Sequence, residues 1–232
     1  MVKTKFIGLI ALVTLLGGPA LAVDGVIEIN QARALAGGVS SGDAAGFPVS
    51  LNSRATYRLT SDLNVPLSTD GIYVDVDDVT IDLNGFSIVS PGGAFHDGIN
   101  ANIVKNLEVR NGTIRGFGRS AVFQVLPSQG WRFIGVRAIS NGVLGLELEG
   151  TVNLIRNCLA QGHSSIGFRT GDGSLVEESI ARSNGDVGLL MLGTVGYRGN
   201  VFTGNNGGDA NPQVSGGLQL GSNVCGTDLV CP

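Results

Sequence analysis

The 232-residue sequence is poor in the residues that build metal centres and aromatic cores. It has two histidines, three cysteines and one tryptophan, and aromatic residues make up 6% of the chain. His96 and His163 fall three coils apart in the repeat described below, on the order of 14 Å at the usual strand spacing, so they cannot share a metal. No cysteine or histidine lies near enough to Cys158 in the pattern to build a zinc set.

Charge is also sparse, and long apolar runs are confined to the N-terminus. Lys3 and Lys5 precede an apolar run from Phe6 to Leu16, and Ala20-Leu21-Ala22 follows. This pattern predicts a signal peptide over residues 1–22, cleaved after Ala22. No later run is long enough to span a membrane. We therefore expect a soluble product exported to the periplasm or the extracellular space.

Basic residues are too few to form a stripe. The chain has 15 basic and 19 acidic residues, and loss of Lys3 and Lys5 leaves 13 basic residues and a net charge of −6. A mildly acidic surface argues against nucleic acid and anionic membranes as partners.

Glycine is abundant, with 37 residues, and it marks a repeat. Val79 to Val89 reads VTIDLNGFSIV, an alternating strand, an Asn-Gly corner and a second alternating strand. Two markers recur in step through the chain at intervals in the low twenties. The first is a small residue before an apolar strand, at Gly71, Gly98, Ala121, Gly145, Gly167, Gly188 and Gly217. The second is a corner pair, at Asn84-Gly85, Asn111-Gly112, Gly135-Val136, Asn157-Cys158, Ser179-Ile180 and Asn200-Val201. This period predicts an all-β parallel solenoid of about seven coils.

These repeats resemble the right-handed parallel β-helix of the pectate-lyase-like superfamily, over roughly Tyr57 to Cys225. The segment Asp24 to Val89 is similar to small secreted bacterial β-helix proteins without an assigned activity. The resemblance implies a right-handed, single-stranded β-helix, and it does not select among lyases, hydrolases, epimerases, adhesins and scaffolds.

The ends of the chain differ from the repeat. We expect residues 23–56 to cap the first coil, with Asn30 capping a short helix from Gln31 to Ala36 and Gly37-Gly38 ending it. The solenoid would span residues 57–224, and residues 225–232 would form a tail. Cys225 and Cys231 in that tail are expected to pair in an oxidising compartment. Cys158 shares the apolar column of Val136 and is expected to be a core thiol.

One constellation on the predicted outer wall points to chemistry. Asp70 and Asp97 each precede a marker glycine and should stack on adjacent coils, while His96 and Arg119 hold equivalent positions one coil apart. The resemblance implies how such a patch could act, because lyases and epimerases of the superfamily use carboxylates or Ca²⁺ to neutralise a uronate while a base removes the adjacent proton. Asp70 and Asp97 would then be the calcium ligands. His163, in a polar corner, is expected to be a solvated loop residue.

The motifs of known enzymes are incomplete here. Of the epimerase Asp-Pro-His-Asp run only His96-Asp97 is present, and a carboxylate before a corner glycine such as Gly98 also has a structural use, satisfying turn amides. Tyr73, Phe123 and Trp131 could offer apolar surface to a glycan or pack beneath turns. We therefore favour a non-catalytic exported β-helix that binds polysaccharide or serves as a scaffold. The alternative is a polysaccharide lyase or epimerase acting on an acidic glycan through Asp70, His96, Asp97 and Arg119.

Overall fold

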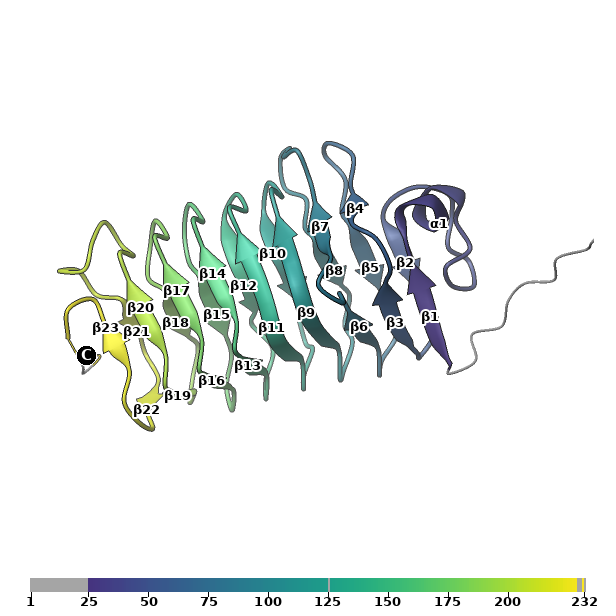
Figure 1. Cartoon of the computed structure of the whole chain (residues 1–232). Helices are drawn as coiled ribbons and strands as arrows, with labels where there is room; N and C mark the ends of the chain where they lie inside the picture. Colours follow the sequence, from purple (N-terminus) through teal and green to yellow (C-terminus); the bar gives the residue numbers. More distant parts are fainter. Residues whose placement is uncertain (1–24, 125, 229–230, 232) are drawn as a thin grey trace, which may run out of the picture.

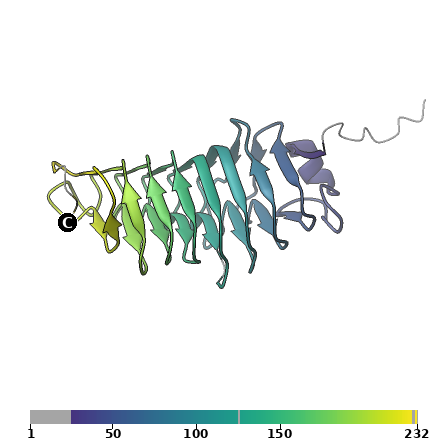
Figure 2. The same ribbon diagram turned by 90° about the horizontal axis from the view of Figure 1, so that it is seen from below.

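The computed structural model describes residues 25–124, 126–228 and 231, and it is a parallel β-solenoid of about eight turns (Figure 1). The predicted signal peptide, residues 1–22, lies outside the described residues. Every pairing between the named strands is parallel, and each strand pairs with the strand one turn further along the chain, so the turns form a single stack (Figure 2).

Two sheets run the length of the stack. The first has eight strands, in the order β2 (Val49–Leu51), β5 (Ile72–Val74), β8 (Ile99–Ala101), β10 (Ser120–Gln124), β12 (Leu144–Leu148), β15 (Phe168–Thr170), β18 (Leu189–Met191) and β21 (Val214–Ser215). Its register aligns Tyr73, Asn100, Phe123, Glu147 and Arg169 in one row.

The second sheet has 15 strands and covers two faces of the solenoid. One face carries β1 (Val26–Ile29), β3 (Thr56–Leu59), β6 (Thr80–Asp82), β9 (Glu108–Arg115), β11 (Arg132–Ile139), β13 (Leu154–Arg156), β16 (Leu175–Glu177), β19 (Gly196–Arg198) and β22 (Leu218–Gln219). The other carries β4 (Leu63–Asn64), β7 (Ser87–Val89), β14 (Leu159–Gln161), β17 (Ile180–Arg182), β20 (Val201–Thr203) and β23 (Val224–Cys225). The long strands β9 and β11 bend around the corner and join the two faces.

Left-handed residues form the corner between these faces. The column is Asn84, Asn111, Gly135, Asn157, Glu178 and Gly199, all with positive φ. The predicted corner marker is therefore right through Asn157 and wrong by one residue at Ser179 and Asn200. Glu178, with φ of 53°, occupies the left-handed position, and a glutamate gives no sequence signal for that backbone.

The glycine marker is right for six turns and wrong for the last. Gly71, Gly98, Ala121, Gly145, Gly167 and Gly188 each precede an inward-facing residue of the eight-stranded sheet. A Cβ on Gly98 would lie 2.1 Å from Ile114 Cγ2, so the turn is too tight there for a side chain. In the last turn Val214 pairs with Leu189, whereas Leu218 belongs to the other sheet and pairs with Gly196.

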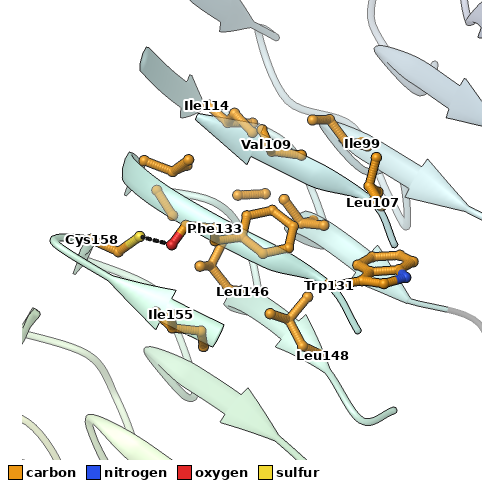
Figure 3. Packing of buried hydrophobic residues seen from close by; sticks show 14 of the residues in the cluster. Ile99, Leu107, Val109, Ile114, Trp131, Phe133, Leu146, Leu148, Ile155 and Cys158 are labelled. Atoms are coloured by element: carbon orange, nitrogen blue, oxygen red, sulfur yellow. Dashed lines mark hydrogen bonds between the residues drawn. The ribbon is translucent and has the colours of Figure 1, made fainter. Parts of the chain in front are cut away.

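The interior is filled by stacked aliphatic and aromatic side chains (Figure 3). Phe133 and Trp131 are fully buried, with ring centroids 6.2 Å apart, and Trp131 Nε1 donates to the Val104 carbonyl at 3.0 Å. Trp131 therefore belongs to the core and offers no surface to a ligand. Cys158 is buried as expected; its Sγ lies 3.4 Å from the Phe133 carbonyl oxygen, and burial raises its thiol pKa to about 12. Such a thiol is inert near neutral pH.

Hydrogen-bonded side chains climb a second corner as a ladder, which we call the amide ladder. Its members occupy equivalent buried positions on successive turns: Asn141, His163, Asn184 and Asn205. Each side chain accepts from the backbone N–H of the previous turn: Asn184 Oδ1 from His163 N at 3.1 Å, and Asn205 Oδ1 from Asn184 N at 3.1 Å. Each also donates to a carbonyl of the turn before. The ladder thereby satisfies corner amides that would otherwise be buried without partners.

His163 occupies one rung of the amide ladder, so the expectation of a solvated loop residue is wrong. Its Nδ1 lies 3.2 Å from Asn141 N and 3.3 Å from the Asn141 carbonyl oxygen, and its Nε2 lies 3.2 Å from the Ala138 carbonyl oxygen. A neutral ring with the proton on Nε2 can accept from Asn141 N and donate to Ala138. Burial lowers the pKa of His163 to about 4. The imidazole replaces an asparagine amide because it also pairs one acceptor with one donor.

The ends follow the expected design in part. Helix α1 (Gln31–Ala36) is capped by Asn30, whose Oδ1 accepts from Arg33 N at 2.9 Å, and it ends at Gly37. The segment 23–56, however, also contributes strands β1 and β2, which pair with β3 and β5. At the other end Cys225 and Cys231 form a disulfide with Cα atoms 5.2 Å apart.

Candidate functional site

The four predicted residues come together at the edge of the eight-stranded sheet, where the chain enters β5, β8 and β10. Asp70 lies one turn below Asp97, and Asp97 N donates to Asp70 Oδ1 at 2.8 Å. His96 lies one turn below Arg119, and Arg119 N donates to the His96 carbonyl at 3.0 Å. The vertical adjacency inferred from the repeat is therefore present in the fold.

The side chain of Asp97 is fully engaged in contacts within the protein. Its side chain is fully buried, and both oxygens accept from Arg119 Nε, at 2.9 and 3.1 Å, while a terminal guanidinium nitrogen also contacts Oδ2. Ser120 N donates to Asp97 Oδ1 at 3.0 Å. Burial raises the pKa of Asp97, and the hydrogen bonds from Arg119 and Ser120 oppose that shift. A carboxylate enclosed in this way cannot reach a ligand on the wall.

Asp70 and His96 form a more accessible pair. Asp70 Oδ1 lies 3.2 Å from His96 Nδ1, and Asp70 Oδ2 accepts from Asn100 Nδ2 at 3.0 Å. The side chains of His96 and Asp70 are 36% and 20% exposed. When His96 is neutral and carries its proton on Nδ1, that N–H donates to Asp70. The Nε2 atom of the same ring can then accept a proton.

The polar cluster extends further than the sequence indicates. Ser120 takes the row position of Asp70 and Asp97 one turn on, and its Oγ donates to Glu147 Oε2 at 2.9 Å. Glu147 and Arg169 each lie two residues after a marker glycine, Gly145 and Gly167, and their side chains are 3.8 Å apart. Arg169 lies closer to Glu149, at 2.7 Å. Burial raises the pKa of Glu147. Ser120 directly precedes its marker Ala121, as Asp70 and Asp97 precede their marker glycines. This equal offset is the sequence signal that could have linked Glu147 to the cluster around Asp97.

Beside this cluster, aromatic side chains stand on the outward face of the eight-stranded sheet, which we call the outer wall. Tyr73 and Phe123 lie in register on either side of Asn100, and all three are partly exposed. The guanidinium carbon of Arg119 lies 3.8 Å from the centroid of the Phe123 ring. This cation–π contact occupies one face of the Phe123 ring.

Phe95 is an exposed aromatic residue at the rim of the same site. It directly precedes His96, its side chain is 75% exposed, and its backbone has φ of 55°. A bulky residue in left-handed backbone costs free energy, and no burial offsets that cost here. Sequence reasoning overlooked Phe95, because nothing in the pattern marks its backbone conformation.

The arrangement fits a bound calcium ion poorly. Within the described residues, no group of three or more histidine, cysteine, aspartate or glutamate side chains is placed to hold a metal. Asp97 faces a guanidinium, and both oxygens of Asp70 accept hydrogen bonds. A divalent cation there would have to displace Arg119 or compete with it.

A shallow hollow of about 550 Å³ lies elsewhere, over the amide ladder, where it is lined by glycines, serines and ladder residues such as His163 and Asn184. The ladder side chains at its floor hydrogen-bond to neighbouring turns. It therefore brings together none of the residues predicted to act on a ligand.

Comparison with known proteins gives no assignment, since no protein-family model, curated protein or solved structure matches this chain. Within the part of the chain that the structure describes, no helix is long and apolar enough to cross a membrane.

Proposed function

We propose that this protein is a non-catalytic, exported β-solenoid that binds polysaccharide on its outer wall. The observation that carries the proposal is the row of Tyr73, Asn100 and Phe123, which presents two aromatic rings around an amide on a rigid sheet. Aromatic faces supply apolar contact area, and amides and carboxylates supply the directed hydrogen bonds that sugar hydroxyls need.

The burial of Asp97 supports a binding role over a catalytic one. Catalysis by a carboxylate needs that group within hydrogen-bond reach of the reacting atoms, whereas Asp97 has no exposed side-chain surface and is held by Arg119. The same contacts make the wall rigid, and a rigid wall lowers the conformational entropy lost on binding.

The proposal is tested by affinity electrophoresis through gels that contain individual polysaccharides. At least one polymer should retard the wild-type protein, and Tyr73→Ala and Phe123→Ala should each weaken that retardation. Ile180→Ala is the matched control, because Ile180 is an exposed apolar residue on the other sheet. Thermal unfolding of each variant separates lost binding from lost folding. Retardation that is the same in all three variants would refute the assignment to this wall.

The second candidate function is a polysaccharide lyase or epimerase acting on an acidic glycan, and the Asp70–His96 pair favours it. Here Asp70 orients the ring and His96 Nε2 removes the proton beside the uronate carboxylate. In a lyase the bond to the leaving sugar oxygen then breaks, a carbon–carbon double bond forms and the departing oxygen takes a proton from water. In an epimerase His96 keeps the abstracted proton, and water delivers a proton to the opposite face of the same carbon.

Ultraviolet absorbance of an unsaturated product, together with deuterium incorporation from solvent, tests this candidate on a panel of polyuronates. If His96→Gln abolishes either signal while thermal unfolding is unchanged, the protein is an enzyme and the binding proposal is wrong.

We extend the proposal to the winding of the solenoid and to its location. Each turn is a crossover between parallel strands of one sheet, and such connections are right-handed in about 98% of cases. A right-handed coil is also what the resemblance to the pectate-lyase-like superfamily implies. Export to the periplasm or the extracellular space is supported by the N-terminal sequence pattern and by the disulfide between Cys225 and Cys231.

A further inference from the structure

From the charges of the outer wall we infer that its ligand is a glycan without anionic groups. This inference rests on the proposed function and names the substrate class of the same site. Four carboxylates flank or join the aromatic row: Asp70, Asp75, Glu147 and Glu149. These carboxylates belong to the same turns as the row that contains Tyr73 and Phe123. A polymer bound on Tyr73 and Phe123 therefore passes close to them.

In the part of the outer wall that the structure describes, no arginine or lysine is free to balance these acids. In β5, β8, β10, β12, β15 and β18 and directly beside them, the arginines are Arg119 and Arg169, and His96 lies 3.2 Å from Asp70. Arg119 is paired with Asp97, and this hydrogen bond raises the pKa of Arg119. Arg169 is paired with Glu149 and Glu147. A uronate carboxylate or a sulfate would therefore meet uncompensated negative charge, whereas hydroxyl and amide groups of a neutral sugar would meet acceptors.

Another face of the solenoid shows the opposite pattern. The strands β7, β14, β17 and β20, with the second halves of β9 and β11, carry Arg115, Arg137 and Arg182. Two acids beside these strands, Asp62 and Asp209, accept hydrogen bonds from Ser87 N and Thr203 Oγ1. All three arginines are exposed. An acidic polymer would therefore be drawn to that face, while the aromatic rings of the outer wall lie on the eight-stranded sheet.

The aromatic residues fit the same ligand class. Tyr73, Phe123 and the rim residue Phe95 give flat apolar surfaces, and the apolar faces of sugar rings stack on such surfaces without any need for charge. Phe95 has an exposed ring and left-handed backbone, and this backbone costs conformational free energy. Such a cost is expected where a residue makes a contact outside the chain.

Isothermal titration calorimetry of the full mature protein with three soluble oligosaccharides at one salt concentration tests the inference. The probes are a neutral β-glucan oligomer, an N-acetylhexosamine oligomer and an oligouronate. We expect heat from at least one of the first two and none from the oligouronate. Oligouronate affinity equal to or above that of both neutral probes overturns the inference but leaves the proposed function standing. Absence of binding by all three refutes the proposed function and this inference with it.

A charge-removing variant provides the internal check. Asp75→Asn combined with Glu149→Gln should give oligouronate heat where the wild-type protein gives none, because two repelling carboxylates are lost and Arg169 is partly released. Glu28→Gln on strand β1 is the control, since it removes one exposed acid from the other sheet. An equal gain from Glu28→Gln would show that net charge alone acts, and would overturn the assignment to the outer wall.

Discussion

The early and late turns of the solenoid differ in length and in what they place on the outer wall. In the late turns equivalent residues are 21 positions apart, as in the pairs Arg156–Glu177 and His163–Asn184. In the turn that begins near Asp70 the separation is 27 to 28 residues, as in Asp70–Asp97 and Asp78–Asn106. Part of the added length lies in the loop that holds Phe95, His96 and Asp97.

The wall position before each marker residue also differs between the early and the late turns. In the early turns it holds Asp70, Asp97 and Ser120, whereas in the late turns Leu144, Ile166 and Val187 form a small buried apolar cluster there. The late turns are regular and stabilised by repetition, and the early turns depart from the repeat where the polar groups gather. Departures from local regularity of this kind mark function more often than they mark stability.

The largest effect is expected from breaking the ion pair of the early turns. Arg119→Ala should lower the free energy of unfolding by about 3–5 kcal/mol, because it leaves the buried Asp97 carboxylate without its counter-ion. Urea denaturation at neutral pH measures this effect. Arg132→Ala is the control; its side chain is 55% exposed and pairs with Glu108 at 3.5 Å, so its loss should cost less than about 1 kcal/mol. Equal costs for the two variants would show that the Asp97 pair is not structural.

The next effect is a pH dependence that belongs to the late turns. His163 has a folded pKa of about 4, below the ordinary value of 6.5, so the unfolded chain binds its proton first. Stability should therefore fall by up to about 3 kcal/mol as the pH falls from about 6.5 to about 4. His163→Asn, which completes the amide ladder with a group that does not titrate, should remove this component. Stability curves of the two proteins that stay parallel over that range would contradict the assigned ring state.

A smaller effect should follow from opening one amide rung. Asn184→Ala removes the acceptor of His163 N and the donor to the Ala160 carbonyl, and we expect a loss of about 2 kcal/mol in chemical denaturation. Ser183→Ala, at the exposed position just before it, serves as the control and should change stability by less than about 0.5 kcal/mol. If the two substitutions cost the same, the ladder does not hold the late turns together.

The smallest effect should appear at the rim. Phe95→Asn should raise stability by about 1 kcal/mol, since asparagine tolerates the left-handed backbone, and should weaken glycan binding. Phe95→Leu keeps the backbone cost and removes the ring, so it should lose binding without gaining stability. Differential scanning calorimetry and titration of the same samples compare the two. Unchanged binding in both variants would remove Phe95 from the site.

The fold can be predicted well from the sequence, because the repeat period determines which residues stack on one another in adjacent turns. The glycine marker alone places Asp70 beneath Asp97 and Glu147 beside Arg169, as the structure has them. The period fails where a turn changes length or where a corner is occupied by a residue that does not mark it. In the last turn the loop after β20 is long, and the final strand of the eight-stranded sheet therefore begins at Val214. At another corner Glu178 has left-handed backbone, a conformation that glycine or asparagine would have marked in the sequence.

The environment of individual residues was harder to predict than their position. His163 stands in a run of serines and glycines that is typical of a solvated corner, yet its alignment with Asn141 and Asn184 assigns it to a buried ladder. Trp131 follows a corner glycine and is nevertheless enclosed by the core. In both cases the polar atoms find partners one turn away, and local sequence contains no information about that turn unless the columns are aligned first.

Hydrogen exchange with and without a saturating neutral oligosaccharide tests the central claim most directly, because it locates the bound polymer on the chain. The account predicts added protection at residues 72–75, 95–101 and 119–124, with no change in β14, β17 and β20. Protection confined to the arginine-bearing face, or conversion of the polymer to a new product during the incubation, would contradict it.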